Sequence, residues 1–358
     1  MVWKEVRSED RRGNEIMKKK ILAVLMVGVM AAMTLMTGCS ASSSAGAEQV
    51  TSRTKYVWKM ALNSTAGDNA YDMAKLFADR IYKQTNGKIV VQLYGGASLG
   101  STTEILDGMK VGVADIMCES VGTLAPYTPL ANIDAMPYAY SGYDHFMKVW
   151  NSKLGDEMRE TIGKAAGFKL IGGCYRGPRI VTATKKMTTV KDFKGFKLRA
   201  PALDMYIRTW KWLKAAPTPL AMTETYTALQ QGTVDGQENP MPDSMNYAFD
   251  EVCDYWIKTN HVYSCNLLIM DRTYYRNLPQ DVKDAVQEAA AYASRQNSRN
   301  ELKKEAQAEK KLKKEGKHVI EVDTAAFAKY FRDFAKTNYP ELNNWVKQIK
   351  AMDPGTDR

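Results

Sequence analysis

An alternation of extended and helical segments, beginning at Tyr56, constrains the fold more than any other feature of the sequence. An extended run over 56–62 is followed by a helical pattern over 68–84 and a second extended run over 88–94. Extended segments separated by amphipathic helices form βαβ units, whose parallel strands lie in one buried sheet. The pattern therefore predicts an α/β fold that begins near Tyr56 and contains a parallel sheet.

This alternation continues through most of the chain and ends in helices. Ser101 and Glu104 have the spacing of a capping box, which predicts the start of a helix, and a strand is expected over 114–118. The longest uninterrupted element is a predicted helix from Pro279 to about Lys314. At 358 residues, the chain is long enough for two lobes. We also predict helices over 145–150, 155–166, 203–213, 223–231, 327–336 and 340–350, and extended segments over 169–174, 180–184, 197–199 and 218–220.

The segment before this fold carries an export signal. Lys18–Lys20 precede an apolar run over 21–36, and Thr37–Cys39 follow at once. A basic start, a short apolar core and small residues after it are typical of a secretory signal peptide, whereas a membrane span needs ~20 apolar residues. A retained membrane helix is the alternative. Residues 1–16 are polar and charged, so translation is expected to start at Met17.

The end of this signal, Met36-Thr37-Gly38-Cys39, resembles a bacterial lipobox. The resemblance implies that Cys39 is lipid-modified and becomes the new N-terminus, so that the upstream extension and signal peptide over 1–38 are removed. The small side chains that follow have little to bury and predict a flexible tether over 39–55. The mature protein is therefore expected outside the cytoplasm, anchored by its lipid to the cell membrane.

Charge and cysteine content narrow the classes of function. Lys and Arg exceed Asp and Glu by 10, but part of this excess lies in 303–317, where opposite charges interleave as on a solvated helix face. Nucleic acid is therefore not an expected partner. No CxxC pair is present and the histidines lie far apart in sequence, so we predict no metal site. The sequence leaves open whether the remaining cysteines form disulfides or stay as buried free thiols: Cys118, Cys174, Cys253 and Cys265.

Three polar residues lie beside extended runs, where ligands bind in open α/β sheets. Arg199 ends a short strand and Pro201 fixes the exit of the chain, so its guanidinium can take a carboxylate through two parallel hydrogen bonds. Asn239 follows a turn at Asp235-Gly236, and Arg179 stands at the entry to an extended run. Ordinary roles also fit, namely a surface salt bridge for Arg199 and helix capping for Asn239.

Four ordered segments between residues 195 and 240 carry a specific resemblance. They are GFKLRAP at 195–201, APTPL at 216–220, ETYTALQQG at 224–232 and VDGQENP at 234–240. In these segments the chain closely resembles the DctP-like solute-binding proteins of tripartite ATP-independent periplasmic (TRAP) transporters. The similarity covers nearly all of the mature chain, from the first extended run to the long helix.

This resemblance implies a two-lobed α/β flytrap, with a long helix spanning both lobes, that closes on one small organic acid. It implies neither catalysis nor a cofactor. We expect lobe I to comprise 56–178 and 266–305, and lobe II to comprise 179–265 and 306–350. The expected partners are the small and large membrane subunits of a TRAP transporter, and the receptor is expected to act as a monomer.

The resemblance also assigns roles to single residues. In the family, the Arg of the LRxP motif pairs with the ligand carboxylate, a role that falls on Arg199. The Asn of the QENP motif supports the same carboxylate, which points to Asn239. An Arg about twenty residues before the LRxP motif often adds a contact, and Arg179 stands there.

The far end of the ligand is expected to meet a second group of residues. Asn63 and Glu119 occupy positions that commonly touch this end in the family, and Met222 lies beside a family contact position. Gly122 and Ala202 stand where sialic-acid binders have polar ligands, so the resemblance disfavours sialic acid. A polar site favours a sugar acid such as a hexuronate over a C4-dicarboxylate.

Two other functions remain open on the sequence alone. An exported enzyme acting on an acidic sugar would need a nucleophile with a base, or two positioned carboxylates. No G-x-S-x-G, H-E-x-x-H or Gly-rich phosphate loop is present. A ligand sensor that feeds a membrane kinase would share the binding chemistry of a transport receptor.

Overall fold

The computed structural model describes residues 49–353 and 355. The predicted signal peptide over 1–38, the start at Met17 and the lipidated Cys39 lie outside these residues, as does most of the tether. The fold begins where the sequence predicts it, because the first strand starts at Tyr56.

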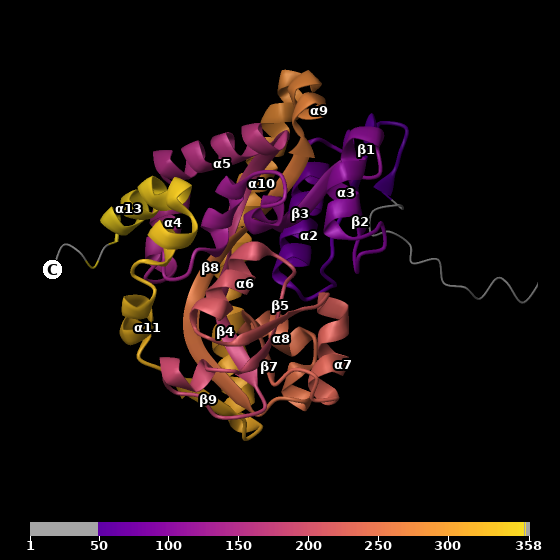
Figure 1. Ribbon diagram of the computed structural model, residues 1–358. Coiled ribbons are helices and arrows are strands. Elements are labelled where there is room, and N and C mark those ends of the chain that lie inside the picture. Colours follow the sequence, from indigo (N-terminus) through magenta and orange to yellow (C-terminus); the bar gives the residue numbers. More distant parts are fainter. Residues whose placement is uncertain (1–48, 354, 356–358) are drawn as a thin grey trace, which may run out of the picture. The chain divides into compact units, whose positions relative to one another are not determined.

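A nine-stranded mixed sheet organises the described part of the chain (Figure 1). Its strands are β1 (Tyr56–Ala61), β2 (Ile89–Tyr94), β3 (Ile116–Ser120), β4 (Phe168–Ala183), β5 (Lys197–Ala200), β6 (Ala216–Pro219), β7 (Gly236–Pro240), β8 (Tyr255–Asp271) and β9 (His318–Glu321). They follow the order β2-β1-β3-β8-β4-β7-β5-β6, and β9 pairs with β8. The predicted parallel pairing holds for β1 with β2 and β3, and for β5 with β6 and β7. It is wrong for the centre of the sheet, where β8 runs antiparallel to β3 and β4, and β4 runs antiparallel to β7.

Two long strands, β4 and β8, pair with each other and connect the two ends of the sheet. The sequence predicts separate extended segments over 169–174 and 180–184, but the structure has one strand of 16 residues. Register shifts interrupt its pairing, and Gly172, Gly173 and Gly177 have positive φ angles of 76°, 150° and 93° at these bulges. The strand bends at these glycines instead of ending, which explains why the sequence pattern indicates a break.

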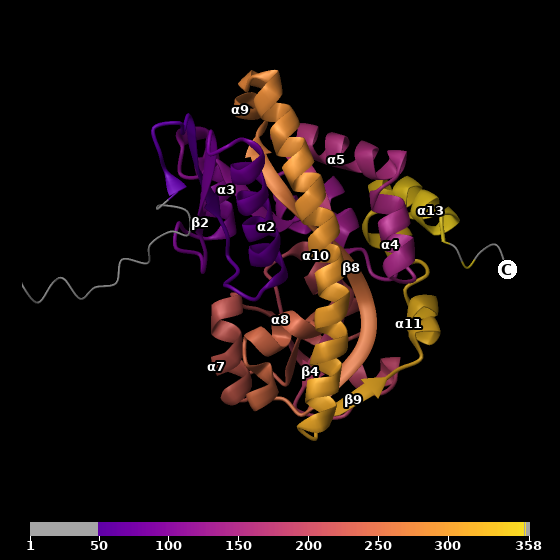
Figure 2. The same cartoon turned by 180° about the vertical axis from the view of Figure 1, so that it is seen from behind.

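The helices include the long one that the sequence predicts. They are α2 (Asn69–Gln84), α3 (Thr102–Gly108), α4 (Tyr143–Trp150), α5 (Lys153–Ala166), α6 (Asp204–Trp212), α7 (Thr225–Gln230), α8 (Met241–Asn246), α9 (Arg272–Asn277), α10 (Gln280–Lys314), α11 (Thr324–Tyr330), α12 (Phe334–Asn338) and α13 (Asn343–Ala351). The capping box at Ser101 and Glu104 is present at the start of α3. With 35 residues, α10 runs along one face of the sheet from α9 to β9 (Figure 2). The predicted helix over 327–336 is instead two helices, α11 and α12.

Apolar side chains hold α2 and α10 against one end of the sheet. Phe77 of α2 and Val286 of α10 are fully buried in one cluster with Met60 of β1 and Ile89 of β2. Burial of each large side chain of this kind contributes roughly 1.5–3 kcal/mol. The four cysteines whose state the sequence leaves open are all free and buried: Cys118, Cys174, Cys253 and Cys265.

The middle of α10 is polar because its side chains accept hydrogen bonds from the backbone of the bulged part of β4. The backbone N–H groups of Gly173 and Tyr175 donate to the hydroxyls of Ser294 and Ser298, each at 3.0 Å. These serines lie four residues apart and therefore on the same face of the helix. Backbone groups at a bulge lose regular ladder partners, and buried N–H groups need an acceptor. The helix supplies that acceptor and so fixes the bend of β4 to α10.

Two carboxyl groups on α10 remain only partly satisfied. Glu301 Oε2 accepts from Asn69 Nδ2 at 2.8 Å, but Oε1 of Glu301 and Oε1 of Glu305 are buried without a hydrogen-bond partner among the described residues. Burial, with added repulsion from Asp243, raises the pKa of Glu301 to about 8. Burial also raises the pKa of Glu305 to about 7. Glu301 therefore keeps its proton at neutral pH.

Replacing Glu301 by Gln is expected to stabilise the protein at alkaline pH. The folded protein keeps this proton while the unfolded chain, with a pKa near 4.3, has lost it, so the free energy of unfolding falls as the pH rises from about 4 to about 8. Glutamine matches the protonated form and cannot ionise. Urea denaturation should show Glu301→Gln more stable than the parent by about 1–3 kcal/mol at pH 8.5, and equal to it near pH 4.

Glu288 offers a matched control on the same helix. Its side chain is exposed and pairs with Arg80 across the surface. Glu288→Gln should change the free energy of unfolding little at either pH. Parallel pH profiles for the parent and Glu301→Gln would contradict the raised pKa.

Candidate functional site

Arg199 is a buried cation that the protein holds by one edge. It pairs with Gln237 of β7 in the sheet, and only 4% of its surface is exposed. Its Nε and Nη2 atoms donate to the carbonyl of Leu220 at 3.0 and 2.8 Å. Burial lowers the pKa of Arg199 to about 10, so the guanidinium stays charged at neutral pH, yet no carboxylate of the described residues lies within 4.0 Å of it. A buried cation of this kind gains most from an anion that comes from outside the chain.

Arg179 differs from Arg199 because its charge is compensated. Its Nη2 atom donates to Oε1 and to the backbone carbonyl of Glu238, each at 2.7 Å, and its guanidinium lies 4.9 Å from the ring centre of Tyr206. His261 Nε2 lies 3.1 Å from Glu238 Oε2. Burial raises the pKa of Glu238, but the charge of Arg179 outweighs this and lowers it to about 2. Arg179 and Arg199, both predicted ligand contacts, therefore differ in their freedom to bind an anion.

The motif at 236–240 forms β7, a strand in which every residue is buried, where the sequence predicts a turn at Asp235-Gly236. Its polar side chains bond to one another and to neighbours, so no alternation of apolar residues marks the strand. The strand also passes too close to its neighbours for a side chain at Gly236, since a Cβ there would lie 2.6 Å from the ring of Phe196 and from the carbonyl of Thr182. Packing thus requires glycine at the position where β7 begins.

Asn239 lies two residues beyond Gln237 on β7 and so on the same face as the strand partner of Arg199. Its Nδ2 atom donates to Gln237 Oε1 at 2.8 Å and lies 3.7 Å from Met222 Sδ. Gln237 in turn donates to Ser244 Oγ at 3.0 Å. The structure thereby gathers Arg199, Asn239 and Met222, three of the residues singled out from the sequence, around one end of β7.

A third arginine, Arg176, joins this group, although no sequence motif singles it out. Its Nε and Nη2 atoms donate to Asp243 Oδ2 at 3.2 and 3.1 Å, and Nη2 lies 3.5 Å from Asn239 Oδ1. Burial lowers the pKa of Arg176, but the charges of Asp243 and Glu119 outweigh this and raise it. The available signal was its position three residues before Arg179 in a glycine-rich stretch of β4.

Glu119 and Asn63 come from the other end of the sheet. Glu119 Oε1 accepts from the N–H of Ser120 at 2.8 Å. Burial raises the pKa of Glu119, and the positive charge of Arg176 opposes this effect. Glu119 therefore lies close enough to interact electrostatically with the arginine group, which consists of Arg176, Arg179 and Arg199. The Asn63 amide donates to Thr102, and its buried Oδ1 has no hydrogen-bond partner among the described residues. Asn63 thus offers an acceptor, but its contacts do not reach the arginines.

Hydrogen bonds join the segment after β1 to α8 and the residue that follows it. Asn246 Nδ2 donates to Asp68 Oδ1 at 2.6 Å, and the hydroxyl of Tyr247 donates to Asp68 Oδ2 at 3.2 Å. The N–H of Asn69 donates to Asp243 Oδ1 at 3.4 Å. Burial, with added repulsion from Asp243, raises the pKa of Asp68 to about 6. These hydrogen bonds hold the segment after β1 against α8, which carries Asp243, the ion-pair partner of Arg176.

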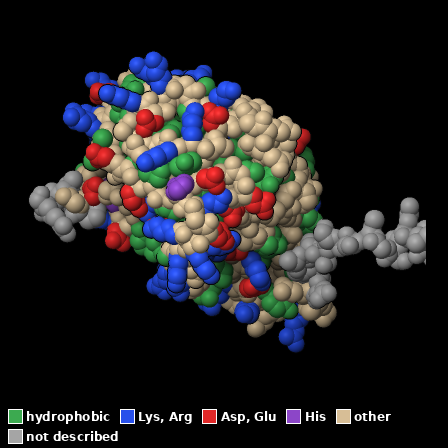
Figure 3. All heavy atoms as spheres, turned by 90° about the horizontal axis from the view of Figure 1, so that it is seen from below, with side chains coloured by type: hydrophobic (Ala, Val, Ile, Leu, Met, Phe, Trp, Pro, Cys, Tyr) green, Lys and Arg blue, Asp and Glu red, His purple; other side chains and the backbone are tan. Residues whose placement is uncertain are grey.

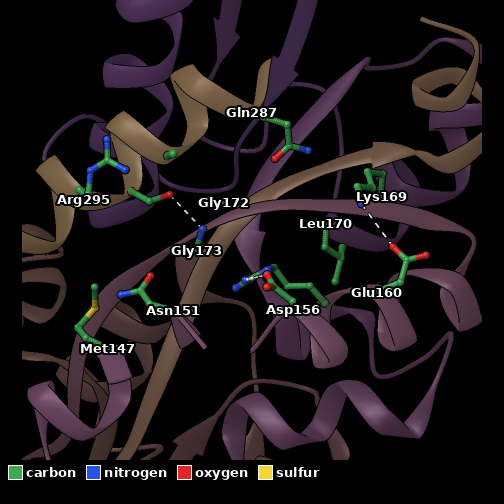
Figure 4. A pocket seen from close by; sticks show the side chains of 13 residues that line it. Met147, Asn151, Asp156, Glu160, Lys169, Leu170, Gly172, Gly173, Gln287 and Arg295 are labelled. Atoms are coloured by element: carbon green, nitrogen blue, oxygen red, sulfur yellow. Dashed lines mark hydrogen bonds and ion pairs between the residues drawn. The ribbon is translucent and has the colours of Figure 1, made fainter. Parts of the chain in front are cut away.

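A cavity of about 530 Å³ lies away from the arginine group, between α5, β4 and α10 (Figure 4). Two of its basic side chains are paired, since Lys169 Nζ lies 3.4 Å from Glu160 Oε2 and Arg159 Nη2 lies 2.6 Å from Asp156 Oδ1, whereas Arg295 forms no ion pair among the described residues. None of the residues singled out from the sequence lines this cavity.

Residues 49–353 and 355 lack the features of a metal site and of a membrane-spanning helix. No group of three or more His, Cys, Asp or Glu side chains in this range could hold a metal ion. No helix there is long and apolar enough to cross a membrane. Basic and acidic side chains are interspersed on the face seen in Figure 3.

Comparison with known proteins finds relatives along most of the chain. Residues 60–343 match the DctP family, described as bacterial extracellular solute-binding protein, family 7. A solute-binding protein of Roseobacter denitrificans is 32% identical over 274 residues, which cover 76% of this chain and 84% of the relative. The sialic acid-binding periplasmic protein of Vibrio cholerae is 28% identical over 290 residues, which cover 81% of this chain and 89% of the relative.

A solved structure shares the fold described above. It is a TRAP periplasmic solute-binding protein from Roseobacter denitrificans with bound L-galactonate, which is 30% identical and superposes with a TM-score of 0.77. The match covers 83% of this chain and 99% of that structure. The chain belongs to the DctP family of bacterial extracellular solute-binding proteins.

Proposed function

We propose that this protein is the extracytoplasmic receptor of a TRAP-type transporter and that it binds a sugar acid through Arg199. The observation that carries the proposal is a buried, charged guanidinium without an ion-pair partner among the described residues. A similar protein binds L-galactonate, and the polar groups around Arg199 suit a hydroxylated acid. A hexuronate or hexonate is favoured, and a C4-dicarboxylate comes next.

The free edge of Arg199 fits a carboxylate. The Leu220 carbonyl accepts from Nε and Nη2, which leaves the edge formed by Nη1 and Nη2 for two parallel hydrogen bonds. Asn239 can support the same carboxylate from β7. The Vibrio cholerae relative binds sialic acid, but Gly122 and Ala202 supply no polar side chain for its additional groups.

Closure of two lobes would complete the site. We assign 56–178 with 266–305 to one lobe and 179–265 with 306–350 to the other, so that Glu119 and Arg199 belong to opposite lobes. A ligand that contacts both lobes binds the closed form more tightly than the open form and shifts the population toward closure. The membrane subunits of the transporter would then receive the acid from the closed receptor.

Arg199→Ala is expected to weaken binding of the sugar acid by roughly 3–5 kcal/mol, several hundredfold or more, because the carboxylate then loses its buried partner. A thermal-shift screen of hexuronates, hexonates and C4-dicarboxylates first identifies the ligand, which adds ~2.7 kcal/mol of stability at 100 times its Kd. Calorimetry then compares the parent with the variant.

Arg208→Ala is the control for this experiment. Arg208 is exposed on α6 and pairs with Asp204, so its loss should leave the affinity unchanged. Near-normal affinity of Arg199→Ala would refute the role of Arg199. No response of the parent to any carboxylate would refute the proposed function itself.

The receptor is further proposed to act as a monomer held at the membrane by a lipid on Cys39. A short tether of small residues keeps the binding site within reach of the membrane subunits while it turns freely. In a bacterial host that processes lipoproteins, Cys39→Ser should abolish incorporation of labelled palmitate and release the protein from the membrane fraction. Equal labelling of parent and variant would contradict lipidation at this residue.

A further inference from the structure

The arginines of the site differ in how their charges are compensated. Arg179 forms an ion pair with Glu238, and Arg176 forms one with Asp243 at 3.1 Å. The net charge of each ion pair is zero. Arg199 pairs with no acidic group in the described chain and is therefore the arginine left for a ligand carboxylate.

Glu119 and Arg176 leave a donor and an acceptor unused. They interact electrostatically, but no ion pair of 4.0 Å or less joins them. Arg176 uses Nε and Nη2 on Asp243, and Glu119 uses Oε1 on Ser120. Within residues 49–353, neither Arg176 Nη1 nor Glu119 Oε2 takes part in a hydrogen bond.

A ligand hydroxyl suits these two groups, because it can accept from a guanidinium and donate to a carboxylate at the same time. A second ligand carboxylate suits them poorly, because it can only accept. It would also place another negative charge near Glu119 and Asp243, where Arg176 and, more weakly, Arg179 already compensate the existing negative charge of Glu119.

We propose that Arg176, Asp243 and Glu119 form a specificity filter that accepts a polyhydroxy acid with one carboxylate and rejects the corresponding diacid. The filter rests on the proposed function, since it presumes that Arg199 takes the first carboxylate. It excludes aldaric acids, and it makes Arg176 a specificity-determining residue that also positions Asn239 through the contact at 3.5 Å.

Calorimetry with matched acids tests the filter on the purified mature protein at pH 7.5. The pairs are galactonate with galactarate and gluconate with glucarate, which differ only in whether the far end is a hydroxyl or a carboxylate. The parent should bind the better monoacid at least ~100-fold more tightly than its diacid. Glu119→Gln, which removes a negative charge and keeps the shape, should reduce that ratio at least tenfold by improving diacid binding.

Glu288→Gln controls for the change in net charge, because this exposed side chain lies on α10 away from the site, and it should leave the ratio unchanged. If Glu119→Gln does not fold, Glu119→Ala serves for the same comparison. A parent that binds a diacid as tightly as its monoacid, or a ratio that Glu119→Gln leaves unchanged, overturns the filter while the proposed function stands. A parent that binds neither acid of any pair, nor any other carboxylate, overturns the proposed function and the filter with it.

Discussion

The buried ion pair between Arg179 and Glu238 is the interaction on which the site depends. It connects β4 to β7, the strand that carries Asn239, and the side chains are 2% and 0% exposed. Buried charges are tolerated only when both partners are hydrogen-bonded, and His261 completes the set for Glu238. Burial lowers the pKa of Arg199, and the negative charge of Glu238 is the strongest of the effects that raise it. Glu238 thus helps Arg199 to stay charged, while the neighbouring charge of Arg179 acts in the opposite direction.

The arrangement of charges in the site has the features that recognition of an anion requires. Glu238 and Asp243, two of the acidic groups nearest to the arginines, are committed to Arg179 and Arg176. An exported hydrolase would need carboxylates free to donate and accept protons at the reacting bond. The guanidinium of Arg199 forms no ion pair among the described residues, and its chemistry is recognition of an anion.

Much of the fold could be predicted from local patterns, because β1, α2, β2, the capping box of α3 and the helix α10 each follow the periodicity of their own residues. The long strand β4 could not be, since bulges at its glycines resemble chain breaks. The strand β7 could not be either, because GQENP carries polar side chains that are buried only through one another. Arg199 and Asn239 were singled out from their motifs and Met222 from its place beside a family contact position, and their contacts with a ligand stay predictions. Arg176 and Asp243 were missed because their pairing depends on how β4 and α8 approach in space.

The central claim is that Arg199 takes the carboxylate of a sugar acid. A crystal structure of the protein with the acid that stabilises it most tests this directly. The account predicts a ligand carboxylate within hydrogen-bond distance of the Nη1–Nη2 edge of Arg199, with its hydroxyl-bearing end toward Glu119. A ligand bound in the cavity between α5, β4 and α10, or at the arginine group with its carboxylate away from Arg199, would contradict it.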